Sequence, residues 1–281
     1  MKDRRRDPAH LQRWLTALLL VPVLAGVIAL GPGWSVLLLV VLATAAALAE
    51  LSELLLAAAS RGLRAITFGL GLLLPLGAYL AGISGLAAAT ALVLFLNIAI
   101  FLLHYPSRDN VIHFLGSTTF AHLYLSFMLA HIVLLYHLPE GRSWVFFVLA
   151  VIFAGDTGAY YIGHRWGRHK LAPTLSPGKT MEGALGGLLC SLVVGFIAAE
   201  TFFSALEVTI WPMLLLAGVL ALVGQLGDLI ESMLKRVCRV KDASRLLPGH
   251  GGLLDRLDSL LFSFPLAYYG SLLLSHFSSR L

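Results

Sequence analysis

The sequence has few charged residues, and this shortage excludes an ordinary soluble globule. Only 12% of its 281 residues are charged, whereas 58% are hydrophobic and the mean hydropathy is +0.86. A typical soluble domain is about 25% charged and about 45–50% apolar. With about half that charge, the chain lacks the polar surface needed to cover a soluble core, and its apolar residues stand in long unbroken runs. The composition therefore predicts an integral membrane protein.

Two features typical of exported soluble proteins are also missing. The cysteines are Cys190, in an apolar run, and Cys238, in a basic one, which gives neither a disulfide framework nor a metal-binding spacing. A basic N-terminus precedes an apolar stretch from Trp14 to Leu30, but no small-residue cleavage site follows it. We therefore expect a retained first helix in place of a signal peptide.

The chain has instead many apolar runs of membrane-spanning length. A transmembrane helix needs about 20 mostly apolar residues. We predict an all-α polytopic membrane protein with about nine transmembrane helices, at residues 13–30, 34–57, 65–81, 84–103, 116–138, 143–163, 184–204, 209–230 and 257–275. We divide it into an N-terminal region, residues 1–140, with the first five helices, and a C-terminal region, residues 141–281, with the last four.

The basic residues predict the orientation of these helices. With the N-terminus in the cytoplasm, 18 of the 20 Lys and Arg residues fall on the cytoplasmic side, and only Arg142 and Arg280 fall outside. Such a bias is typical of cytoplasmic loops. It places the two longest polar loops, 164–183 and 231–256, at the cytoplasmic face. Because the charge is concentrated in short loops, it favours anionic lipid or phosphate as a partner over nucleic acid.

The first polar region follows the sixth predicted helix. Asp156 lies inside an apolar run, where a carboxylate is costly, so it either faces a polar cavity or pairs with a cation for structural reasons. The motif SPGKT, at 176–180, precedes Glu182 and an apolar helix. Backbone N–H groups at such a turn suit phosphate, and Lys179 adds a positive charge. The combination of Thr180 with Glu182 equally fits a helix cap.

The second polar region carries more of the unusual side chains. Asp228, Glu231, Ser232 and Lys235 have the spacing i, i+3, i+4 and i+7, which places them on one face of a helix at the end of the eighth apolar run. Further basic residues follow. They are Arg236, Arg239, Lys241 and Arg245. They serve either as phosphate contacts or as interfacial anchors.

A glycine-rich turn and two more carboxylates complete this region. Residues 248–252, PGHGG, allow a backbone to approach a ligand closely, because three of the five residues are glycine, which has no Cβ. Asp255 and Asp258 follow at i and i+3, again on one helix face. Carboxylates from two helices, surrounded by basic residues, are typical of a site for Mg²⁺ bound to a polyphosphate.

This region resembles the signature of the phosphatidate cytidylyltransferases (CDP-diacylglycerol synthases). The matching residues are Ser232, Leu234, Lys235, Arg236, Lys241, Asp242, Leu247, Pro248, His250, Gly251, Gly252, Asp255, Arg256 and Asp258. The upstream motifs DTGAY and SPGKTxEG also resemble that family, with His164 where an arginine is expected and Met181 where a tryptophan is common. The resemblance is strong from about residue 150 to 275 and only architectural before that.

The resemblance implies a reaction and a role for each polar residue. An oxygen of phosphatidic acid attacks the α-phosphorus of CTP and pyrophosphate leaves, in the bacterial inner membrane. Asp228 and Asp255 bind Mg²⁺, with a second metal ion left open, and Lys179 and Lys235 neutralise phosphates. The implied substrate contacts are Ser176, Thr180, Ser232, Arg236, Lys241, His250 and Arg256. The implied supporting residues are Asp156, Glu182, Glu231, Asp242 and Asp258. A homodimer is left open.

Two other classes of protein remain open from the residues themselves. A related polyprenol or phytol kinase would use the same acidic and basic groups, but it would convert CTP to CDP. An ion-coupled transporter would use Asp156 and Asp228 in an ion pathway, although the polar residues lie toward one face and not at the midplane, where transporter sites are usual. Glu50 and Glu53, at i and i+3 in the second apolar run, receive no assignment.

Overall fold

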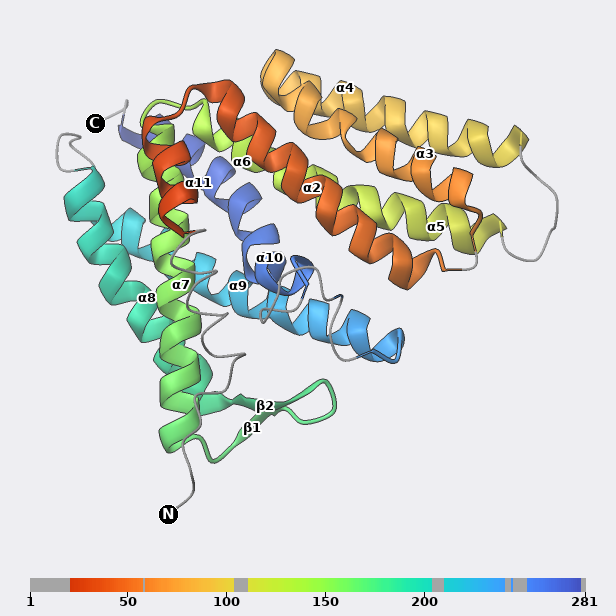
Figure 1. Cartoon of the computed structure of the whole chain (residues 1–281). Coiled ribbons are helices and arrows are strands. Elements are labelled where there is room, and N and C mark those ends of the chain that lie inside the picture. Colours follow the sequence, from red (N-terminus) through yellow and green to blue (C-terminus); the bar gives the residue numbers. More distant parts are fainter. Residues whose placement is uncertain are drawn as a thin grey trace. The chain divides into compact units, whose positions relative to one another are not determined.

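A computed structural model describes residues 21–57, 59–103, 111–203, 210–240, 244 and 252–278. Within these ranges the chain is almost entirely helical, and the strands are the two short ones of a hairpin. By its internal contacts the chain divides into two compact units, residues 1–126 with 240–256, and residues 127–239 with 257–281. Figure 1 shows the elements of both units.

Each unit is built from its own set of helices. The first contains α2 (Gly33–Leu55), α3 (Arg61–Gly71), α4 (Leu73–Leu103) and α5 (Val111–Ala121). The second contains α6 (Met128–Tyr136), α7 (Gly141–Trp166), β1 (Lys170–Ala172), β2 (Ser176–Thr180), α8 (Met181–Phe202), α9 (Ile210–Val237) and α11 (Ser263–Ser278). The chain passes from one unit to the other within the π-helix His122–Phe127, between Arg239 and Val240, and within α10 (Leu254–Leu261).

Seven helices in the described residues are long and apolar enough to cross a membrane. They are Gly33–Leu55, Arg61–Leu103, Ile112–Tyr136, Gly141–Trp166, Met181–Phe202, Ile210–Val237 and Leu254–His276. A shorter apolar helix, Val21–Leu30, begins where the described residues begin. The prediction of an all-α polytopic membrane protein is confirmed. The seven helices are fewer than the nine predicted, partly because most of the predicted span 13–30 lies outside the described residues.

The remaining difference in number comes from the stretch Arg61–Leu103, which is 43 residues long. Its backbone leaves the helical region at Ala81 and Gly82, and Gly82 has a φ of +61°, which glycine adopts at little cost. A Cβ on Gly77 would lie only 2.6 Å from the carbonyl oxygen of Gly85. The two arms therefore fold back and pack closely against each other, and the break separates two of the predicted spans.

One face of helix α8 has the apolar surface expected of a helix that contacts lipid. Leu185, Leu189 and Val193 recur every four residues along α8, and each exposes 60–63% of its surface. A contiguous apolar stripe of this kind is rare on a soluble monomer but is the expected surface toward lipid. The opposite face of α8 carries buried glycines and Ser191.

Those glycines bring α7 and α8 together. A Cβ on Gly187 would lie 2.7 Å from the carbonyl oxygen of Gly155 in α7, and the hydroxyl of Ser191 donates a hydrogen bond to the carbonyl of Val151 (2.8 Å). Small residues at membrane helix interfaces allow such close backbone approach. Figure 1 shows α7 and α8 side by side, with the hairpin at their ends.

Among the described residues, the hairpin differs in type from the sequence prediction. SPGKT forms strand β2, which pairs antiparallel with β1, with Lys170 opposite Thr180 and Ala172 opposite Ser176. The motif was expected as a turn with free backbone N–H groups. Pairing across the hairpin commits part of this backbone instead. Strand β2 leads directly into α8.

Candidate active site

Three carboxylates meet where α9 packs against α10. One oxygen each from Asp228, Glu231 and Asp258 lie within 4.8 Å of one another. Asp228 and Glu231 share a face of α9, as their i, i+3 spacing predicts. The approach of α10 depends on Gly227, because a Cβ there would collide with the carbonyl oxygen of Asp258. The predicted metal ligands were Asp228 and Asp255, and the structure groups Asp228 with the two predicted supporting residues.

Two lysines balance this negative charge. Lys179 Nζ, from β2, lies 2.7 Å from Asp228 Oδ2, and Lys235 Nζ, one turn further along α9, lies 2.5 Å from Glu231 Oε2. Glu231 is fully buried. A buried carboxylate is tolerated only when it is paired or coordinates a cation. The lysines therefore provide the compensation that these carboxylates need within the protein.

Asp156 adds a fourth carboxylate from α7. It interacts with the charges of Asp228 and Lys179, and the side chain of Ser259 is hydrogen-bonded to it. It also lines a cavity. The arrangement joins one carboxylate from α7, two from α9 and one from α10 within the second unit.

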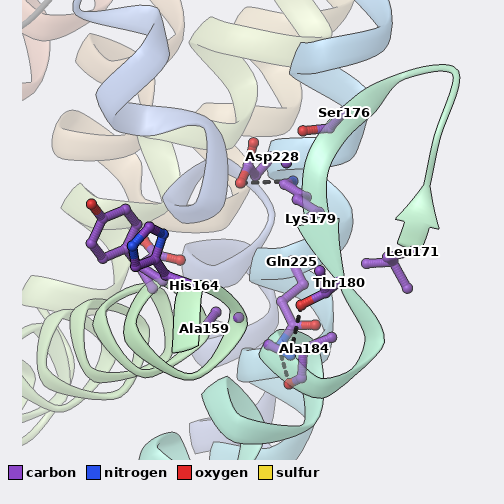
Figure 2. A pocket seen from close by; sticks show the side chains of 14 residues that line it. Ala159, His164, Leu171, Ser176, Lys179, Thr180, Ala184, Gln225 and Asp228 are labelled. Atoms are coloured by element: carbon purple, nitrogen blue, oxygen red, sulfur yellow. Dashed lines mark hydrogen bonds and ion pairs between the residues drawn. The ribbon is translucent and has the colours of Figure 1, made fainter. Parts of the chain in front are cut away.

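The cavity has a volume of about 450 Å³ and opens beside these groups. Figure 2 shows Lys179 and Asp228 in contact at one side of it and His164 at another. Its lining residues are Asp156, Ala159, Tyr160, Gly163, His164, Leu171, Ser176, Gly178, Lys179, Thr180, Gly183, Ala184, Gln225 and Asp228. This set combines a lysine, two carboxylates and several hydrogen-bonding groups with apolar and glycine surface. A volume of this size is sufficient for a nucleotide-sized or drug-sized ligand.

The hairpin that carries Lys179 is held at three points. Thr180 is the N-cap of α8, and its hydroxyl accepts a hydrogen bond from the N–H of Gly183 (3.1 Å). Glu182 Oε2 accepts hydrogen bonds from the N–H groups of Arg168 (3.0 Å) and His169 (3.2 Å). Thr180 is therefore a helix cap, one of the two functions that its sequence left open.

The third point is Arg236, which the resemblance implies as a substrate contact. Arg236 Nε donates a hydrogen bond to the carbonyl of Leu175 (3.2 Å), in the turn of the hairpin. This contact fastens the turn to the end of α9. It restrains Ser176 and Lys179, which line the cavity from the strand that follows.

The signature segment is only partly described. Asp255 lies in the first turn of α10 and accepts a hydrogen bond from the N–H of Gly252 (3.0 Å). Ser232 lies half-buried on α9, and Arg256 follows Asp255. The implied residues Lys241, Asp242 and His250 lie outside the described residues, as does Arg245.

Gln225 is a polar cavity residue to which the sequence analysis assigns no role. Gln225 lies one turn before Asp228 on α9, lines the cavity, and donates a hydrogen bond from Nε2 to the carbonyl of Ala184 (3.0 Å). An amide in an apolar run is itself a signal, because a polar group inside a membrane helix needs a partner. Gln225 thereby ties α9 to α8 beside the cavity.

The carboxylate cluster fits a divalent cation. Mg²⁺ prefers oxygen ligands and is commonly bound through one or two carboxylates together with substrate phosphates. Asp228, Glu231 and Asp258 offer such oxygens from two helices at mutually compatible distances. Two lysines, Lys179 and Lys235, are paired with carboxylates of this cluster and supply positive charge beside it.

Comparison with known proteins gives consistent matches. A family model described as "Cytidylyltransferase family" matches residues 11–274. The chain is 48% identical over 127 residues to a phosphatidate cytidylyltransferase of Staphylococcus haemolyticus, over 45% of this chain and 48% of that protein. Over the same shares it is 49% identical to the protein of that name from Staphylococcus epidermidis and 47% to that from Staphylococcus aureus. The matched region spans about half the length of these curated relatives.

Proposed function

The chain belongs to the cytidylyltransferase family, and from this premise we propose that it transfers CMP from CTP to phosphatidic acid, giving CDP-diacylglycerol and pyrophosphate. The proposal depends on one observation above all. Four carboxylates and two lysines from α7, β2, α9 and α10 gather beside a cavity in the second unit. The relatives named as phosphatidate cytidylyltransferases support the choice of substrates.

The proposed reaction is a single displacement at phosphorus. A phosphate oxygen of phosphatidic acid forms a bond to the α-phosphorus of CTP, and the bond from that phosphorus to the bridging oxygen breaks. The electron pair leaves with pyrophosphate, and no proton needs to move because the nucleophile is already an anion. Catalysis of this kind consists mostly of positioning and charge neutralisation.

The chain's own groups would divide these tasks. Lys179 and Lys235 would neutralise phosphate oxygens as negative charge moves to the leaving group. Asp228 would hold Mg²⁺ together with Glu231 and Asp258, and bound Mg²⁺ would supply additional charge neutralisation. Asp255 is the further ligand that the family resemblance implies. The proposal includes a second metal ion only if Asp255 binds one.

The other polar residues have proposed supporting roles. Ser176 and Thr180 line the cavity, and Asp156 lies beside Asp228. Glu182 and Arg236 would act by holding the hairpin in place. The residues proposed to bind substrate from the signature are Ser232, Lys241, His250 and Arg256, with Asp242 as their support.

The proposed topology has nine spans with the N-terminus in the cytoplasm. The break at Ala81–Gly82 supports counting Arg61–Leu103 as two spans, since 43 helical residues would extend about 64 Å and a bilayer core is about 30 Å thick. The family resemblance supports the bacterial inner membrane, and the order of the predicted spans supports a division at residue 140 into N-terminal and catalytic regions.

The experiment uses CTP labelled in either the α- or the γ-phosphate. Purified protein in detergent is incubated with phosphatidic acid and Mg²⁺, and the lipid is extracted. The proposal expects α-label in the lipid, γ-label in pyrophosphate, and loss of both in excess chelator with recovery on adding Mg²⁺. A lipid kinase would instead transfer the γ-label to lipid. Turnover that continues in excess chelator, or no transfer at all, contradicts the proposal.

A further inference from the structure

Glu50, which the sequence left unassigned, is buried in α2 and has three hydrogen-bond donors. Only 4% of its surface is exposed. Oε1 accepts hydrogen bonds from the hydroxyl of Ser244 (2.6 Å) and the N–H of Leu253 (2.8 Å), and Oε2 accepts one from the N–H of Leu254 (2.8 Å). All four residues belong to the first unit. Charge-assisted hydrogen bonds of this number offset the cost of burying a carboxylate.

The three donors all belong to the segment that carries the family signature. Leu254 is the first residue of α10 and Leu253 precedes it. The first N–H groups of a helix have no partner within the helix, and a negative charge there is favoured by the helix dipole. Glu50 thus supplies from α2 the acceptor that the start of α10 needs. It holds Ser244, nine residues upstream of Leu253, with the same oxygen.

Asp255 directly follows Leu253 and Leu254, whose N–H groups are held by Glu50. Its own Oδ2 accepts the N–H of Gly252 (3.0 Å), so the chain on both sides of Leu253 is fixed by carboxylates. The direction of the first turn of α10 decides where the Asp255 side chain points. Groups that orient a metal ligand commonly change metal affinity or activity by about 10–100-fold when they are removed.

We propose that Glu50 is a positioning residue for the proposed reaction: by fixing Leu253 and Leu254 it sets the orientation of Asp255 and with it the affinity of the site for Mg²⁺. The inference rests on the proposed function. It assigns a task to the N-terminal part of the chain, which holds none of the site residues expected from the sequence. Glu50 acts through the backbone of α10 and does not itself touch the reacting groups.

Four substitutions test this role, and one of them is a matched control. Glu50→Gln keeps the size of the side chain but replaces one acceptor oxygen with an NH₂ group, which then faces an N–H donor. Glu53→Gln makes the same chemical change one turn along α2, where the side chain is exposed. Glu50→Asp keeps the carboxylate and shortens its reach. Ser244→Ala removes one of the three donors and leaves Glu50 in place.

The experiment measures the Mg²⁺ requirement in two ways on the full chain in detergent. One is the Mg²⁺ concentration for half-maximal CDP-diacylglycerol formation, and the other is the concentration for half-maximal thermal stabilisation with CTP present and no phosphatidic acid. We expect Glu50→Gln to raise both about tenfold, Glu50→Asp and Ser244→Ala to raise them less, and Glu53→Gln to leave both unchanged. A half-maximal concentration does not depend on how much of the protein folds.

The outcomes separate this inference from the proposed function. If Glu50→Gln and Ser244→Ala both keep the wild-type Mg²⁺ requirement, Glu50 only stabilises the fold and the inference is overturned, even where the yield of folded protein drops. If Glu50→Gln gives no folded protein, the Mg²⁺ requirements of Glu50→Asp and Ser244→Ala decide the question. Wild-type values in both variants overturn the inference, and raised values support it. If the wild-type chain makes no CDP-diacylglycerol, the proposed function fails, and the thermal titration alone still tests whether Glu50 controls Mg²⁺ binding.

Discussion

Lys179 and Asp228 form an ion pair of 2.7 Å that joins strand β2 to helix α9. The two residues come from the two polar regions of the sequence, 49 positions apart, and both line the cavity. Each partner also has a role in the proposed reaction, the lysine toward phosphate and the carboxylate toward Mg²⁺. The pair therefore links the hairpin to the carboxylate cluster.

Replacing Lys179 with Gln should lower kcat/KM for CTP by about 10²-fold, since a positive charge aimed at developing negative charge is lost from a partly enclosed site. The Tm in detergent should fall by a few degrees, because Asp228 loses its partner. Lys170→Gln, on the exposed face of β1 in the same hairpin, is the control and should retain wild-type kinetics. Equal losses in the two variants would show that only the net charge of the hairpin matters.

Asp258→Asn should separate catalysis from stability. Asp258 lies close to the negative charges of Asp228 and Asp156, so removing its charge relieves repulsion between carboxylates. We expect turnover to fall about 10²-fold, while the Tm without added metal stays the same or rises. The measurements are CDP-diacylglycerol formation and thermal unfolding in a chelator. A variant with normal turnover would remove Asp258 from the proposed metal site.

Gly227→Ala should disturb the site through packing alone. A Cβ at this position collides with the backbone of α10 at Asp258, and forcing extra volume into a packed interface costs about 1–3 kcal/mol. We expect a lower Tm together with a higher Mg²⁺ requirement, since the carboxylates of α9 and α10 move apart. Gly218→Ala, on the same helix, is the control, because its Cβ would meet only Leu192 Cδ2 at 3.5 Å. If the two variants behave alike, close approach at Gly227 is not what positions the site.

Reporter fusions test on which side of the membrane each loop and the C-terminus lie. A reporter inserted in the loop 164–183 or in 231–256 should be cytoplasmic, and one fused after Leu281 should lie on the opposite side, because the basic residues concentrate in the predicted cytoplasmic loops. A C-terminal reporter in the cytoplasm would contradict the nine-span proposal.

Part of the fold and site follows directly from sequence spacing. The i, i+3 relation of Asp228 and Glu231 is local to one helix, so their shared face was predictable. The break in α4 falls where Gly82 interrupts an apolar run too long for one crossing. Both features depend on residues near one another in the chain, which is why the sequence was sufficient for them.

Other features depend on contacts that spacing does not encode. Asp255 and Asp258 lie on neighbouring positions of one helix face, and the grouping of Asp258 with Asp228 follows from the glycine contact between α9 and α10. SPGKT becomes a strand only because residues 170–172 pair with it. Glu50 is hydrogen-bonded to Leu253, 203 residues away. These long-range contacts had no local signal.

The most direct test of the account compares the wild-type chain with Asp228→Asn in CMP transfer from α-labelled CTP to phosphatidic acid at saturating Mg²⁺. Asp228 belongs to every part of the proposed site, since it is in the carboxylate cluster, pairs with Lys179 and lines the cavity. The account predicts α-label in the wild-type lipid, in equal amount to pyrophosphate, and a loss of about 10²–10³-fold in Asp228→Asn, with Arg239→Ala, an exposed residue after α9, near wild type. Near-normal transfer by a folded Asp228→Asn variant would contradict it.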